Sequence, residues 1–171
     1  TTAPVRGPRA CESERAAASD AGRARDLAEL ALFVAERVPG TPAWRSRLKG
    51  YALAFIGNAR RVGNDLPAAD KAFARARPLW REGAPADSGL LDEALFLDLE
   101  ASLRRDQRRF AEALMLHDQA LAFARPEKAS FILINKAKVL EELEDFEGAL
   151  ATLQQAVPLI EEQREPRMLF I

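Results

Sequence analysis

Reactive and metal-binding side chains are scarce in this chain, which contains one cysteine and one histidine. Cys11 has no second thiol with which to form an internal disulfide, so a reducing cytoplasm is the expected compartment. A lone histidine and a lone cysteine do not supply the ligands of a common zinc site. We therefore expect neither a metal nor any other cofactor.

Short motifs that mark common enzyme sites are also missing. The sequence has no phosphate-binding GxxxxGK, no GxSxG nucleophile elbow and no HExxH metalloprotease motif. His117 lies among leucine and alanine residues of a predicted packing helix, so we interpret it as a partly buried structural side chain. These absences predict a protein that is not an enzyme.

Long apolar runs and an excess of either charge are absent as well. No stretch approaches the ~20 apolar residues needed to cross a bilayer. The 25 basic and 26 acidic residues nearly cancel, which gives no reason to expect binding to a membrane surface. Aromatic residues are not interleaved with the arginines as base-stacking platforms require, so nucleic-acid binding is not expected either.

The sequence does contain a spacing of small residues that is written three times. In each copy a glycine or alanine is followed twelve positions later by an alanine, with further expected contact residues four and seven positions beyond it. Small residues let two helices approach closely, so this spacing predicts repeated helical hairpins. The copies are Gly57, Ala69, Phe73 and Ala76; Ala101, Ala113, His117 and Ala120; and Ala137, Ala149, Leu153 and Ala156.

Apolar residues recur at three and four positions along most of the chain, which predicts helices rather than strands. Pro126 is expected to close the second hairpin, and 81–89 is expected to be a loop. The expected organisation is a flexible lead (1–8), a degenerate first repeat or capping helices (9–49), three hairpins (within 50–163) and the truncated start of a further helix (164–171). The expected helices cover 23–38, 44–62, 67–79, 91–105, 110–123, 129–143 and 146–161, which form hairpins at about 50–80, 94–125 and 130–161.

The repeated unit resembles the tetratricopeptide repeat, and Phe110 to Leu121 (FAEALMLHDQAL) is the closest local match. The resemblance implies an all-α fold, a right-handed superhelix of antiparallel helical hairpins. Repeats begin 44 and 36 residues apart, whereas the family unit is about 34 residues. Arginine or histidine replaces frequent aromatic positions of the family at Arg60, Arg104 and His117. The resemblance is carried by Leu53, Gly57, Leu66, Ala69, Phe73 and Ala76; by Leu97, Ala101, Phe110, Ala113, Leu114, Ala120 and Leu121; and by Leu133, Ala137, Phe146, Ala149, Leu150 and Ala156.

First helices of this family line a concave surface, and the resemblance assigns residues of this chain to it. Their apolar members would form a groove for an amphipathic helix or an extended peptide, unless neighbouring repeats or further chain cover it. The family's carboxylate clamp is not expected, because Ala54 and Leu99 stand where a lysine and an asparagine belong. The assigned residues are Tyr51, Ala54, Phe55, Asn58 and Arg61; Leu95, Asp98, Leu99, Ser102 and Arg105; and Phe131, Ile134, Asn135, Lys138 and Glu141.

Arginines gather where the first two of these helices end, and acidic residues take their place in the third hairpin. This arrangement could orient a charged partner or simply be solvated.

We expect a scaffold that binds a protein or peptide. One alternative is a sensor or regulatory arm of a signalling or transcription protein, which would bind a peptide or small ligand. The other is an oligomerisation module that binds another copy. The abundance of arginine and alanine suits a bacterial protein.

Overall fold

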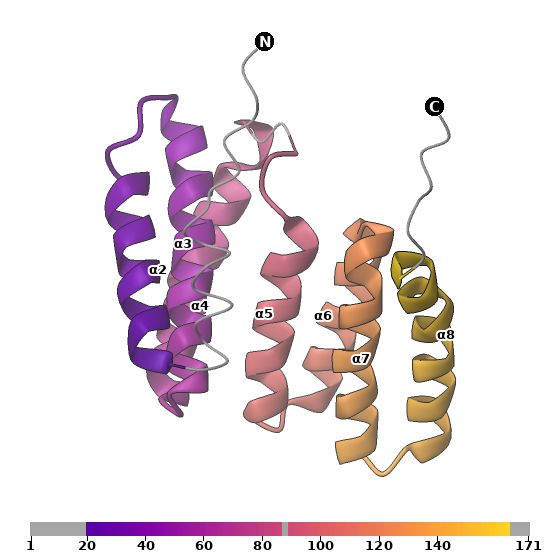
Figure 1. Ribbon diagram of the computed structural model, residues 1–171. Coiled ribbons are helices and arrows are strands. Elements are labelled where there is room, and N and C mark those ends of the chain that lie inside the picture. Colours follow the sequence, from indigo (N-terminus) through magenta and orange to yellow (C-terminus); the bar gives the residue numbers. More distant parts are fainter. Residues whose placement is uncertain (1–19, 87–88, 165–171) are drawn as a thin grey trace, which may run out of the picture. The chain divides into compact units, whose positions relative to one another are not determined.

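The computed structural model describes residues 20–86 and 89–164, and all regular structure in these residues is helical. The chain divides into two compact units, the first ending at Asp92 and the second beginning at Glu93. Figure 1 shows the helices of each unit running antiparallel to their neighbours in sequence. The elements are α2 (Ala21–Ala35), α3 (Pro42–Val62), α4 (Leu66–Glu82) and the short 3-10 helix η1 (Ala84–Ala86), followed by α5 (Glu93–Asp106), α6 (Phe110–Phe123), α7 (Pro126–Glu142) and α8 (Phe146–Arg164).

In the first unit α3 is the central helix, since both α2 and α4 pack against it. Side-chain caps fix where these helices begin. Asp20 accepts from the backbone N–H of Arg23 at 3.0 Å, and Asp65 accepts from that of Ala68 at 3.1 Å. Each cap satisfies a backbone donor that has no partner inside the helix. Proline also stands in the first turn of α3 and of α4, where its missing N–H costs nothing.

In the second unit each helix packs against the next one in sequence, and α5 also contacts α7. The pairs α5–α6 and α7–α8 are the two hairpins of this unit (Figure 1). None of the helices in the described ranges combines the length and the apolar character that a membrane crossing requires.

The predicted helix 110–123 has the same bounds as α6, 44–62 ends where α3 ends, and 146–161 begins where α8 begins, whereas the other boundaries differ. Pro126 was expected to close the second hairpin, but it opens α7, because a proline is tolerated in the first helical turn. The expected loop 81–89 contains the end of α4 and the short helix η1. The predicted lead (1–8), the first part of the degenerate repeat and most of the truncated helix (164–171) lie outside the described residues.

Small residues do occupy the helix crossings. A Cβ atom added to Gly57 would lie 2.7 Å from two ring carbons of Phe73, so α4 can approach α3 only because position 57 has no side chain. The close approach of two helices that the sequence predicts at Gly57 is therefore confirmed. The alanines of the repeated spacing are likewise buried: Ala69, Ala76, Ala101, Ala113, Ala120, Ala137, Ala149 and Ala156.

The turns inside the three hairpins share one backbone geometry. Asn64, Arg108 and Glu144 have φ values of 61°, 60° and 62°, which place them in the left-handed region. In each turn the N–H of the left-handed residue and the next N–H both bond back to carbonyls of the preceding helix. Asparagine adopts this region more readily, whereas in arginine and glutamate it brings Cβ too close to the following carbonyl oxygen, which costs free energy.

Glu144→Gly is expected to stabilise the second unit by about 0.5–1 kcal/mol, because glycine adopts a positive φ without a Cβ clash. Asn64→Gly is the matched control and should gain less, since asparagine already suits the same geometry. Urea unfolding followed by circular dichroism measures both changes. A loss of stability in Glu144→Gly would mean that the glutamate side chain contributes more than its backbone strain costs.

Candidate binding surface

A seam of polar side chains joins α5 to α7 within the second unit. Asn135 Nδ2 donates to both carboxylate oxygens of Asp98, at 3.3 and 3.1 Å, and Lys138 Nζ donates to Asn135 Oδ1 at 3.4 Å. Farther along the same helices, Arg105 Nε lies 3.5 Å from Glu142 Oε1. Asp98, Arg105, Asn135 and Lys138 were assigned to one face from the sequence, and the structure brings them together.

His117 of α6 lies beneath this seam. Its side chain is 1% exposed, and Nδ1 is 3.1 Å from Asp98 Oδ1. The contact lacks hydrogen-bond alignment, and neither ring nitrogen has a hydrogen-bond partner among the described residues. The sequence identified His117 as a buried structural residue but missed its contact with Asp98. The sequence did contain an indication of this contact. The positions that correspond to Asp98 and His117 carry apolar residues in the other copies, Ala54 with Phe73 and Ile134 with Leu153.

The outer side of the seam is a row of residues on successive turns of α7. Phe131 is 60% exposed, Asn135 follows four residues later and is half-buried, and Lys138 is exposed. Ile134 is half-buried beside them, whereas Ser102 of α5 is buried. The row presents an aromatic ring, a primary amide and an ammonium group within about 10 Å along the helix axis, given a rise of ~1.5 Å per residue.

The apolar groove predicted from the sequence is not present as expected. Phe55 is 1% exposed, Leu99 5% and Leu95 9%, so these side chains belong to the protein interior. A helical period assigns residues to one face, but it does not reveal whether that face is covered. Phe131 is the member of the predicted apolar set whose side chain is largely exposed.

In the first unit the predicted residues join an aromatic cluster. Tyr51 packs edge-on against Phe55, with ring centroids 5.1 Å apart, and stacks on Trp80 at 5.5 Å. The guanidinium of Arg47 lies 3.1 Å from the Trp80 ring centroid, and its Nη1 donates to the Trp80 carbonyl at 2.8 Å. Arg47 and Trp80 were not singled out from the sequence. A glycine inside the predicted helix 44–62, Gly50, was the sequence feature that could have indicated this close contact. In the structure a Cβ atom at Gly50 would lie 2.8 Å from the Trp80 backbone nitrogen.

Asn58 and Arg61, the remaining predicted residues of the first unit, bond to each other. Asn58 Oδ1 accepts from Arg61 Nε at 3.1 Å and from Nη2 at 2.9 Å. Asn58 is buried and Arg61 half-buried. Asn58 Oδ1 and two of the Arg61 nitrogens are therefore engaged in an intrahelical contact, which reduces what the pair can offer to a partner.

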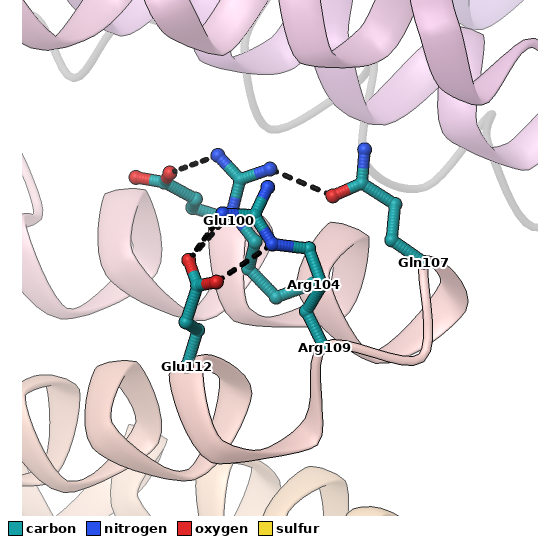
Figure 2. Close-up of polar contacts among 5 residues, drawn as sticks. All are labelled: Glu100, Arg104, Gln107, Arg109 and Glu112. Carbon is teal, nitrogen blue, oxygen red and sulfur yellow. Dashed lines mark hydrogen bonds and ion pairs between the residues drawn. The ribbon is translucent and has the colours of Figure 1, made fainter.

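Arginines at the end of α5 and in the turn that follows it are bonded to carboxylates and to an amide (Figure 2). Arg104 is buried and donates to Glu100 Oε1 at 2.9 Å and to Gln107 Oε1 at 2.7 Å. Arg109 forms two 2.7 Å hydrogen bonds with Glu112, whose second oxygen is also 3.8 Å from Arg104 Nε. Arg105 pairs with Asp106 at 2.7 Å. The expectation of solvated arginines is therefore wrong for Arg104, and Arg104, Arg105 and Arg109 each have a carboxylate partner nearby.

No group of three or more His, Cys, Asp or Glu side chains in the described ranges is arranged to bind a metal ion. No family model matches the chain, and no curated protein matches it. The structure is similar to the helical protein in the crystal structure of BtubC (BKLC) from P. vanneervenii. The TM-score is 0.63 and the sequence identity 16%, over 98% of this chain and 70% of that one. At this identity the similarity concerns the fold alone.

Proposed function

We propose that the chain is a non-catalytic module of the tetratricopeptide type that binds a segment of another protein. The proposed type includes stacking of the hairpins into a right-handed superhelix. It is supported by the repeated small-residue spacing and by the shared geometry of the hairpin turns. The low exposure of His117 supports a non-catalytic role, because a catalytic group must touch its substrate.

The observation that carries the proposal is the row on α7. Phe131 offers an exposed aromatic face to an apolar side chain, and aromatic residues are enriched among the anchors of protein interfaces. Lys138 is exposed and can reach a carboxylate or a main-chain carbonyl. The fitting partner is a peptide that carries an apolar residue about two helical turns away from an acidic one.

A peptide library displayed on phage and selected against the whole chain tests this proposal. Phe131→Ala is expected to weaken the selected peptides at least tenfold, since an aromatic anchor is worth about 1.4 kcal/mol or more. Phe123→Ala is the matched control, because Phe123 is 62% exposed and lies outside the α7 row. Fluorescence anisotropy gives both affinities. Equal affinity for the parent and Phe131→Ala, or failure to select any peptide, would contradict the proposal.

A further inference from the structure

Helix α8 presents an apolar stripe without a covering element among the described residues. Its exposed fractions are 65% at Phe146, 59% at Leu150, 40% at Leu153 and 49% at Val157. These positions are three and four residues apart, so they share one face of the helix. Phe73 and His117, the residues that match Leu153 in the other copies, are 0% and 1% exposed. The third copy therefore leaves open a position that the first two cover.

Acidic residues flank the beginning of this stripe in the sequence. Glu141, Glu144 and Glu147 are exposed, and they have no ion-pair partner within the described part of the chain. Phe146 and Leu150 thus form an apolar surface with a negative border. A complementary partner has an apolar recess with a positive border.

The first unit contains such a recess between α2, α3 and α4. Its volume is about 420 Å³. Leu32, Leu53, Ile56 and Ala72 give it an apolar lining. Its charged border consists of Arg60, Lys71 and Arg75, together with Glu29, which lies 3.8 Å from Arg25.

Two of these cations are available to a partner. Lys71 and Arg75 are exposed, four residues apart on α4, and neither has an ion-pair partner in the residues that the structure describes. Arg60 is less available, because its Nη1 lies 3.9 Å from Asp65. The recess therefore offers an apolar floor next to two unneutralised positive charges.

We propose that the chain associates head to tail, the start of α8 in one copy docking in the α2–α3–α4 recess of the next. Phe146 and Leu150 enter the recess, and Glu147 faces Lys71 and Arg75 of the other copy. Pairing of two α8 helices start to start is disfavoured, because it brings the acidic borders together. The contact is heterologous, so an open assembly retains one free recess at one end and one free helix at the other unless a ring closes. It uses neither Phe131 nor Lys138 and is independent of the proposed function.

Sedimentation velocity of the whole chain over a concentration series tests the proposal with two blocked variants. Leu150→Glu disables the helix, and Lys71→Glu combined with Arg75→Glu disables the recess; all three positions are at the surface, so circular dichroism should be unchanged. The parent is expected to associate with rising concentration, and less so in high salt. Each blocked variant is expected to be monomeric. An equimolar mixture of the two is expected to form a 1:1 dimer, because each supplies the half that the other lacks.

Met115→Glu is the matched control, since Met115 is 52% exposed on α6 and lies outside both surfaces; it should associate like the parent. A parent that remains monomeric at its highest soluble concentration overturns the proposal. Association of the recess-blocked variant on its own overturns it too, and would show that α8 or another surface pairs without the recess. Monomers in the equimolar mixture would equally contradict head-to-tail docking.

Discussion

Glu100→Ala is expected to lower the free energy of unfolding by about 3–5 kcal/mol, the usual cost of removing one partner from a buried ion pair. The side chains of Glu100 and Arg104 are 2% and 4% exposed, and their charged atoms are 2.9 Å apart. Without the carboxylate, the guanidinium stays buried beside the neutral amide of Gln107 and the more distant Glu112. Urea unfolding of the whole chain, followed by circular dichroism, measures the loss.

A second variant separates the ion pair from the packing around it. Glu100→Met combined with Arg104→Met keeps comparable volume and buries no charge, so its stability is expected to lie within about 1 kcal/mol of the parent or above it. Glu112→Ala is the surface control and should cost less than about 1 kcal/mol, because that side chain is 41% exposed. If Glu100→Ala loses no more than this control, burial of the ion pair is not what stabilises the end of α5.

The helices and their pairing could be predicted because they depend on short-range pattern. The spacing of Gly57 from Ala69 and Phe73 reports a single contact between two helices joined by a short turn, and that contact is the one the structure contains. Boundaries were harder to predict where proline occurs. Pro126 is compatible with the end of one helix and with the first turn of the next, and only the surrounding chain decides between them.

The candidate surface was predicted less well, because exposure depends on elements far away in sequence. The family resemblance assigned Phe55, Leu99 and Phe131 to one concave face, yet the first two are buried and the third is 60% exposed. Glu100 and Arg104 illustrate the same limit. They are four residues apart on one helix, a spacing that describes a solvated surface pair and a buried one equally well.

Ala113→Glu is expected to cost at least about 3 kcal/mol, since it forces both volume and a charge into a closed helix crossing. Ala113 is 0% exposed on α6, and Ala101 on α5 is equally buried. A loss of this size should lower the melting temperature by about 6 °C or more.

Ala113→Ser adds one small polar atom and should give a folded variant of intermediate stability, which keeps the test informative if Ala113→Glu does not fold. The neighbouring Glu112→Ala should change the melting temperature far less, because the Glu112 side chain is 41% exposed. Similar losses at positions 112 and 113 would mean that the repeated spacing of small residues does not mark the helix contacts.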